Sequence, residues 1–251
     1  MRNAVVAAAC AVLALCGVQP AGAAEVTVLA STAIKTALQA LAPEFEKAAG
    51  HRLAITYGAS GRLKPQIEKG TPFDLAILSA GVTDALLKQG KLDGASRIVL
   101  ARSGAGLAVR QGAPKPDIST VDGFKRALLA AKSLGYSEAG ATGQFMTAMF
   151  RKLGIVEEMK PKLKLARPGV PSMKALADGE VDIVLPQMSE VALYPGVELV
   201  GPLPAELQVY TVLPAAVGAG AKEAQAAKAL LKFLSSPAAA QVYKAKGLEP
   251  G

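Results

Sequence analysis

The sequence predicts an α/β fold divided into two lobes. Short apolar runs alternate with longer helical patterns, which is typical of strand–helix units built around a mostly parallel sheet. Three such units follow one another before residue 90. The chain has 251 residues, more than a usual single domain, yet no Ser/Gly-rich or charged linker divides it. We therefore expect two lobes of continuous architecture, each with a mostly parallel sheet flanked by helices.

The first residues have the pattern of a secretory signal peptide. Arg2 precedes an uncharged apolar run over residues 4–17, and small residues follow at 21–24. The run is shorter than the roughly 20 residues of a membrane-spanning helix, and nothing comparable recurs downstream. We predict a signal peptide over residues 1–23, with cleavage after Ala24 as a close alternative, and export of a soluble mature chain.

The two cysteines, Cys10 and Cys16, lie inside the predicted signal peptide. We expect no lipid anchor at Cys16, because the bulky Leu15 fills a place that lipoproteins give to a small residue. The mature chain then contains no cysteine, which excludes disulfides and a thiol nucleophile.

Basic residues exceed acidic ones, with a formal charge of +8 for the whole chain and +7 once Arg2 is removed. Tryptophan is absent, and Lys and Arg do not cluster with aromatic residues. We expect no nucleic-acid partner, because such a binder needs stacking side chains beside phosphate-binding ones. The excess charge favours a soluble surface with some attraction for anions.

Three N-terminal units account for the first lobe. Each unit is a short apolar strand, a turn of small residues and a helix that ends at a glycine. The strands are expected at residues 26–30, 53–57 and 74–78, and the helices that follow them end at Gly50, near Gly70 and at Gly90.

A crossing into the second lobe is expected where two extended segments within residues 98–110 flank Ser103 and Gly104. Helical and extended patterns alternate beyond it, and the chain closes with two helices separated at Ser236-Pro237. The helices are expected at residues 120–131, 141–153, 170–179 and 222–246, and the strands at 133–136, 181–186, 198–200 and 208–214.

Three of the predicted strands deliver a small hydroxyl-bearing turn directly to a helix start. These turns contain Ser31 and Thr32, then Ser60, then Ser79. In an open α/β sheet such strand ends line the crevice where ligands bind, and the unpaired N–H groups of a helix start attract anions. The turns therefore favour an anion site made of hydroxyls and backbone N–H groups. Alternatively, each hydroxyl only caps its helix.

The residues of common catalytic sites are missing. The single histidine, His51, lies at a helix–strand junction and is expected to be a solvated surface residue. Neither a Ser-His-Asp nor a Cys-His arrangement is supported. Four aspartates lack the spacing of metal ligands and are interpreted as turn and surface residues: Asp74, Asp84, Asp178 and Asp182. We expect no cofactor, no directly coordinated cation and no enzyme activity.

Several runs of residues are specific enough to indicate a family. They are Leu29-Ala30-Ser31-Thr32, Leu41-Ala42-Pro43-Glu44-Phe45-Glu46, Tyr57-Gly58-Ala59-Ser60-Gly61, Gln66-Ile67-Glu68-Lys69-Gly70, Phe73-Asp74, Leu78-Ser79-Ala80, and, in the C-terminal helices, Phe233-Leu234 and Pro237. These runs resemble the periplasmic molybdate-binding proteins and their wider solute-binding relatives. The similarity spans nearly all of the mature chain and is most specific in its N-terminal third.

The resemblance implies a two-lobed clamshell that closes on a small anion. Two crossovers, near Ser103 and Thr211, would join the lobes. The first lobe would comprise residues 24–103 and 212–251, and the second residues 104–211.

The resemblance also implies how the anion is held. The hydroxyls of Ser31 and Ser60 would hydrogen-bond it, with Thr32 and Ser79 in the same crevice. Backbone N–H groups of the second lobe, at Ala141-Thr142 and at Val170 before Ser172, would complete the shell. The side chains of Thr142 and Ser172 suit either ligand contact or helix capping.

One departure from the family pattern bears on the ligand. Molybdate-binding proteins carry a tyrosine that donates to the oxyanion shortly after a Gly-Glu-Ala-Asp turn. This chain has Gly-Glu-Val-Asp at 179–182, lacks that tyrosine, and carries Gln187 and Ser189 nearby. A donor lost from a desolvated shell costs about 1–3 kcal/mol unless another group replaces it. The identity of the anion is therefore open.

Three charged residues have open roles. Arg62 and Arg102 would suit bidentate contacts to a carboxylate, with surface or interlobe roles as the alternative. Glu206 would repel an oxyanion if it lay near the cleft, and is otherwise a solvated loop carboxylate.

Taken as a member of this family, the chain is expected to be the periplasmic binding subunit of an ABC importer. It would capture a molybdate- or tungstate-type oxyanion and deliver it, as a monomer, to a permease in the inner membrane. Two alternatives are a small organic carboxylate as ligand and a sensing receptor that is not coupled to transport.

Overall fold

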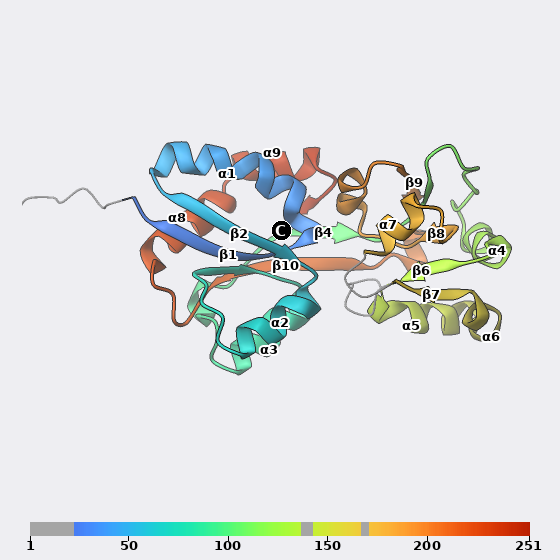
Figure 1. Cartoon of the computed structure of the whole chain (residues 1–251), viewed down its shortest axis with the longest axis horizontal. Helices are drawn as coiled ribbons and strands as arrows, with labels where there is room; N and C mark the ends of the chain where they lie inside the picture. Colours follow the sequence, from blue (N-terminus) through green and yellow to red (C-terminus); the bar gives the residue numbers. More distant parts are fainter. Residues whose placement is uncertain (1–22, 137–142, 167–170) are drawn as a thin grey trace, which may run out of the picture.

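The computed structural model describes residues 23–136, 143–166 and 171–251. The predicted signal peptide, except Ala23, and the predicted contacts at Ala141, Thr142 and Val170 lie outside the described residues. Helices and strands form two lobes, each with one sheet between layers of helices (Figure 1). In the part of the chain that is described, no helix is both long and apolar enough to cross a membrane.

The first lobe contains a six-stranded sheet with the order β11-β4-β10-β3-β1-β2. Its strands are β1 (Glu25–Ser31), β2 (Arg52–Gly58), β3 (Leu75–Ile77), β4 (Ile98–Gly104), β10 (Tyr210–Val217) and β11 (Glu249–Pro250). β1 runs parallel to its two neighbours, β2 and β3, as the strand–helix units predict. The carboxyl ends of these three strands therefore meet at one edge of the sheet.

Helices cover both faces of this sheet. On one face lie α1 (Lys35–Ala49), α8 (Ala224–Leu234) and α9 (Pro237–Ala245), and on the other lie α2 (Ser60–Glu68) and α3 (Ala80–Lys88) (Figure 1). α1 follows a short 3-10 turn, η1 (Thr32–Ile34), and buries Leu38, Leu41 and Phe45 against the sheet. It ends at Gly50, whose φ of 71° suits glycine.

The second lobe contains a five-stranded sheet with the order β7-β6-β8-β5-β9. Its strands are β5 (Gly106–Arg110), β6 (Leu134–Tyr136), β7 (Leu163–Leu165), β8 (Ile183–Val184) and β9 (Val197–Pro202). α4 (Val121–Ala130), α5 (Gly143–Leu153) and α6 (Val156–Met159) pack on one face, and α7 (Ser172–Ala177) and the 3-10 helix η4 (Met188–Leu193) on the other. Shorter 3-10 turns are η2 (Gly94–Ser96), η3 (Lys160–Lys162) and η5 (Ala205–Leu207).

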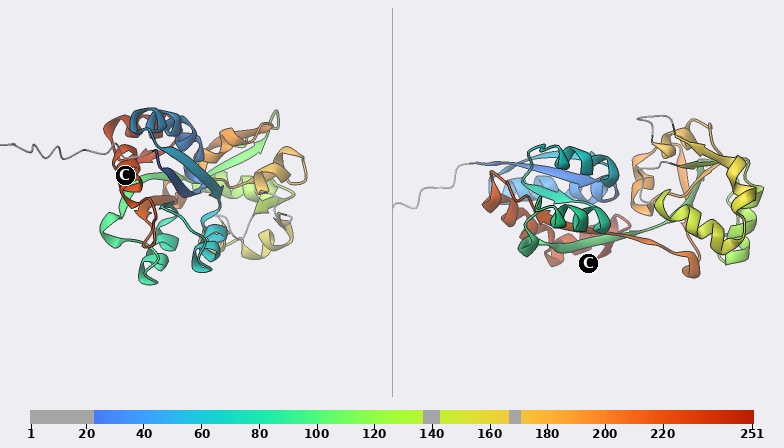
Figure 2. Two further views of the ribbon diagram at one scale, coloured as in Figure 1. Left: turned by 60° about the vertical axis from the view of Figure 1, so that its left-hand side comes forward. Right: turned by 90° about the horizontal axis from the view of Figure 1, so that it is seen from below.

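Two adjacent crossovers join the lobes (Figure 2). One passes from β4 to β5 through Ala105, and the other from β9 to β10 through Gln208. The Ala105 N–H donates to Gln208 Oε1 at 2.9 Å and to the Val209 carbonyl at 3.0 Å, while Gln208 Nε2 donates to the Ala105 carbonyl at 3.0 Å. The Gln208 side chain thus ties the crossovers together.

The expectation of mostly parallel sheets needs one correction. β10 returns from the second lobe and lies antiparallel between β3 and β4, and β11 is antiparallel to β4. In the second sheet β5 is antiparallel to both β8 and β9. Both sheets are therefore mixed, because each crossover brings in a strand that does not come from a strand–helix–strand unit.

Several predicted elements are shorter in the structure. The strand expected at 181–186 is β8, which pairs only at Ile183 and Val184. The helix expected at 170–179 is α7, which begins after Pro171 and stops at Ala177. α6 and β7 were not predicted, because this charged part of the sequence shows no clear helical or strand period.

Candidate ligand-binding cleft

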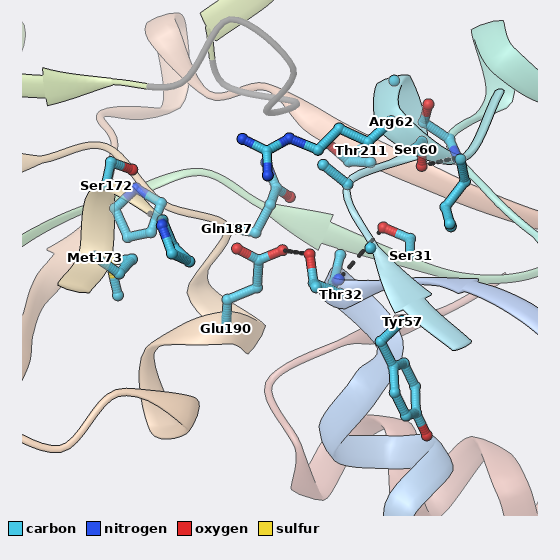
Figure 3. Close-up of a pocket in the computed structure, with 18 of the residues that line it drawn as sticks. Ser31, Thr32, Tyr57, Ser60, Arg62, Ser172, Met173, Gln187, Glu190 and Thr211 are labelled. Carbon is cyan, nitrogen blue, oxygen red and sulfur yellow. Dashed lines mark hydrogen bonds between the residues drawn. The ribbon is translucent and has the colours of Figure 1, made fainter. Parts of the chain in front are cut away.

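A cavity of about 360 Å³ lies between the lobes. The first lobe lines it with the ends of β1 and β2 and the starts of η1 and α2. The second lobe lines it with the start of α7, the segment after β8 and part of η4. Figure 3 shows side chains from both lobes converging on this space. The cleft therefore lies at the sheet edge where the hydroxyl-bearing turns were predicted to meet.

Ser31, Ser60 and Ser79 all line the cavity. Ser31 caps η1, because its Oγ accepts a 3.3 Å hydrogen bond from the Ala33 N–H. Ser60 Oγ accepts a 2.9 Å bond from the Ser79 N–H and so links two turns rather than capping its own helix. Since both hydroxyls act as acceptors in these bonds, their protons are free to be donated to a ligand.

The hydroxyl of Thr32, by contrast, already donates a hydrogen bond within the protein. This 2.7 Å bond goes to Oε1 of Glu190, which belongs to η4 in the second lobe. The Glu190 residue is partly exposed, and many protein atoms lie close to its carboxyl group. Burial raises the pKa of Glu190, and the bond from Thr32 partly offsets this. The pKa of nearby Tyr194 is also raised, by burial and by the Glu190 charge.

Gln187 is the predicted residue with the most unusual surroundings. Only 4% of its surface is exposed, and neither its amide nitrogen nor its amide oxygen has a hydrogen-bond partner among the described residues. It lines the cavity directly above Glu190 in Figure 3. A buried amide without partners costs free energy, so it indicates a place for a bound polar group.

Arg62 supplies positive charge at the cavity. Its side chain is exposed and extends from α2 over the cavity toward Gln187 (Figure 3). Arg102 lies outside the cavity lining, where it bonds Glu249 Oε2 at 2.7 Å and stacks on Tyr210. Of the two arginines proposed for carboxylate contact, the structure brings only Arg62 to the cleft.

Of the other predicted residues, Ser172 lines the cavity and Glu206 does not. Ser172 lines the cavity at the start of α7, with Met173 beside it. Glu206 is exposed and does not line the cavity, as expected of a solvated loop carboxylate.

Two residues outside the cleft make contacts that were not predicted. Asp74 was interpreted as a turn or surface residue, but it is 4% exposed and accepts bonds from the N–H groups of Thr27, at 2.8 Å, and Glu223, at 2.9 Å. His51 is only partly exposed, and its Nδ1 accepts a 3.2 Å bond from the Ala24 N–H. Asp74 thus connects β1 to the start of α8, and His51 connects the start of β2 to the segment before β1.

Sequence reasoning did not identify Glu190 or Tyr194 as cleft residues. η4 has no strand or helix period that would place their side chains, and the partner of Glu190 is 158 residues away. Across the described ranges, no group of three or more His, Cys, Asp or Glu side chains is arranged to hold a metal ion.

Comparison with known proteins finds sequence similarity to binding proteins and to an enzyme. Residues 26–249 match the model of a family described as bacterial extracellular solute-binding protein. Over 229 residues the chain is 33% identical to an aconitate isomerase of Pseudomonas sp., covering 89% of this chain and 87% of the relative. It is 28% identical over 234 residues to the molybdate-binding protein ModA of Azotobacter vinelandii, covering 90% of each.

Solved structures support the fold. The periplasmic molybdate-binding protein of Azotobacter vinelandii superposes with a TM-score of 0.70 at 21% identity, covering 90% of this chain and 99% of the other. At this identity the likeness shows a common two-lobed clamshell architecture, not a common ligand.

Proposed function

The chain belongs to the bacterial extracellular solute-binding protein family, and from that premise we propose that it captures a small organic carboxylate in the cleft between its lobes. The observation that carries this proposal is the unpaired amide of Gln187, buried in the cavity with Arg62 extended above it. The amide offers a donor and an acceptor, and the guanidinium offers charge and two parallel donors for a carboxylate.

The size of the cavity supports an organic ligand. At about 360 Å³, it falls in the range of about 300–1,000 Å³ that is usual for small organic molecules. Ser31 and Ser60, with free protons on their hydroxyls, face the opposite wall and would bind further oxygens of the ligand. A ligand with two or three carboxylates would use both walls at once.

The charge of Glu190 does not separate a tetrahedral oxyanion from an organic carboxylate, because an ionised carboxylate in the cavity repels a molybdate dianion and a di- or tricarboxylate alike. We favour the organic carboxylate over the predicted molybdate-type ligand because of the Gln187 amide, the Arg62 guanidinium and the volume of the cavity. The proposed context remains an exported binding protein in the periplasm that delivers its ligand to an ABC permease.

A ligand screen by thermal unfolding tests this proposal. Molybdate, tungstate, acetate, succinate and aconitate would be compared at equal ionic strength, because a ligand at 100 times its Kd stabilises by about 2.7 kcal/mol. We expect stabilisation by the di- and tricarboxylates. Stabilisation by molybdate and tungstate alone would exclude the carboxylate proposal.

Matched variants locate the site. Arg62→Ala should weaken carboxylate binding, whereas Arg102→Ala, which removes an exposed ion pair outside the cavity, should leave it unchanged. Equal effects of both variants would show that binding depends on general positive charge rather than on this cleft.

A second candidate function is isomerisation of the captured carboxylate. The relative named aconitate isomerase shares 33% of its residues with this chain across most of both lengths. The cleft also contains a carboxyl group, Glu190, that simple capture of an anion does not require. Incubating the protein with one geometric isomer of aconitate and following the other by proton NMR tests this activity directly.

A further inference from the structure

Glu190 uses one of its two carboxyl oxygens to bond another side chain. Oε1 accepts the 2.7 Å bond from Thr32. The other oxygen points away from Thr32, toward the space bordered by Gln187 and Ser172 (Figure 3). Among the described residues, Glu190 forms no ion pair, and it is the one carboxylate that lines the cavity. One oxygen therefore positions the group while the other faces the ligand space.

We propose that Glu190 is the catalytic residue of a 1,3-proton shift on the bound carboxylate. This inference rests on the proposed capture of a carboxylate in the same cleft. Glu190 Oε2 would take a proton from a methylene carbon that lies between a carboxylate and a carbon–carbon double bond. After the shift it would return the proton at the far carbon of that double bond.

The step balances without any further reagent. The electron pair of the broken methylene C–H bond becomes the π bond of the new double bond. The π electron pair of the old double bond forms the new C–H bond with the proton carried by Glu190. One C–H bond breaks and one forms, and Glu190 ends as it began. For aconitate the shifted product is again aconitate, and the geometry in which the cleft holds the carbon chain decides whether it is cis or trans.

The neighbours of Glu190 suit this role. Burial raises the pKa of Glu190, which makes its carboxylate a stronger base. The Gln187 amide and the Arg62 guanidinium lie where they would stabilise negative charge that spreads onto a carboxylate during the shift. Tyr194 is a poorer base, because burial and the Glu190 charge keep its hydroxyl protonated.

Two glutamate variants test the inference. Glu190→Gln keeps the shape of the side chain but cannot accept the proton, so isomerisation of aconitate should fall by about 10²- to 10⁴-fold. Binding of aconitate, measured by calorimetry, should stay within a few-fold of wild type or become tighter. Glu206→Gln, which changes an exposed glutamate outside the cavity, should isomerise at the wild-type rate.

A measurement in D₂O adds a readout that a structural role would not change. With wild type, the hydrogen removed from the methylene carbon should reappear at the far carbon of aconitate, or be replaced there by deuterium where the proton on Glu190 exchanges with solvent before it returns. Glu190→Asp should slow both this transfer and isomerisation, and Glu190→Gln should slow both by about 10²- to 10⁴-fold. Isomerisation by Glu190→Gln at the wild-type rate would overturn the inference. Binding of aconitate by wild type without isomerisation would also overturn it but leave the capture of carboxylates standing. Failure to bind any carboxylate would remove both.

Discussion

The hydroxyl of Thr32 and the carboxyl group of Glu190 form a 2.7 Å hydrogen bond that connects the two lobes. Beside it, Ser189 Oγ donates to the Ala33 carbonyl at 2.7 Å and contacts Ser103 Oγ at 2.9 Å. η4 of the second lobe is thereby attached to η1 and β4 of the first. Polar contacts at one side of the cleft thus hold the lobes together and orient Glu190 at the same time.

Thr32→Val should weaken this connection. The variant keeps the side-chain shape but leaves the surrounded carboxyl group of Glu190 without its donor, so we expect a loss of about 1–3 kcal/mol in the free energy of unfolding. Denaturant unfolding measures it. Thr71→Val, at an exposed position, is the control and should change stability little. Equal stability of wild type and Thr32→Val would show that the bond contributes nothing.

Gln187→Met should change stability and binding in opposite directions. Methionine has a similar volume and removes two buried polar atoms that lack partners, so the ligand-free protein should gain about 1–3 kcal/mol. Carboxylate affinity should fall, because the donor and acceptor are lost. Unfolding and calorimetry measure the two effects, with the exposed Gln241→Met as control. A variant that is destabilised and binds normally would contradict the proposed contact.

Asp74→Asn should destabilise the first lobe by about 2–3 kcal/mol, because the buried carboxylate accepts bonds from Thr27 in β1 and Glu223 before α8. Asp84→Asn is the matched control, since Asp84 forms an exposed ion pair with Arg97 and should contribute under about 1 kcal/mol. Thermal unfolding measures both. Similar losses from the two variants would mean that Asp74 has no special structural role.

The contribution of Glu190 should make the folded protein less stable as pH rises. The pKa of Glu190 is raised in the folded protein, so between the ordinary glutamate pKa and the folded value the folded chain holds a proton that the unfolded chain has lost. The contribution of Glu190 to stability is therefore complete at low pH and is lost as pH rises through the folded pKa.

The comparison with Glu190→Gln isolates this effect. Glu68, Asp117 and Glu198 have lowered pKa values, caused mainly by hydrogen bonds, and act with the opposite sign, but they titrate identically in both proteins. Subtracting the two curves of unfolding free energy against pH should leave a fall with rising pH. A flat or rising difference would show that Glu190 has no raised pKa.

Local patterns in the sequence predicted much of the first lobe. The apolar periods of β1 and α1, and the hydroxyl-bearing turns at Ser31, Ser60 and Ser79, depend on neighbours within one strand–helix unit and are visible in a short window of sequence. The missing family tyrosine also directed attention to Gln187, which the structure places in the cleft.

Features that depend on distant residues were not predictable in this way. β10 lies between β3 and β4 only because the chain returns from the second lobe. Buried Asp74 accepts a hydrogen bond from the N–H of Glu223, 149 residues later. Glu190 becomes a cleft residue only when η4 packs against η1. Each of these depends on how the two lobes and both ends of the chain come together.

The order of strands in the first sheet has a consequence for folding. β5 to β9 are contiguous along the chain, so the second sheet can assemble from neighbouring segments. The first sheet cannot be completed until β10 has paired with β3 and β4, and β11 has paired with β4 at the edge. Such long-range pairing is slow because a large loop must close first. The sheet that carries Ser31 is therefore complete only once β10 and β11, which follow the whole second lobe in the chain, have been synthesised.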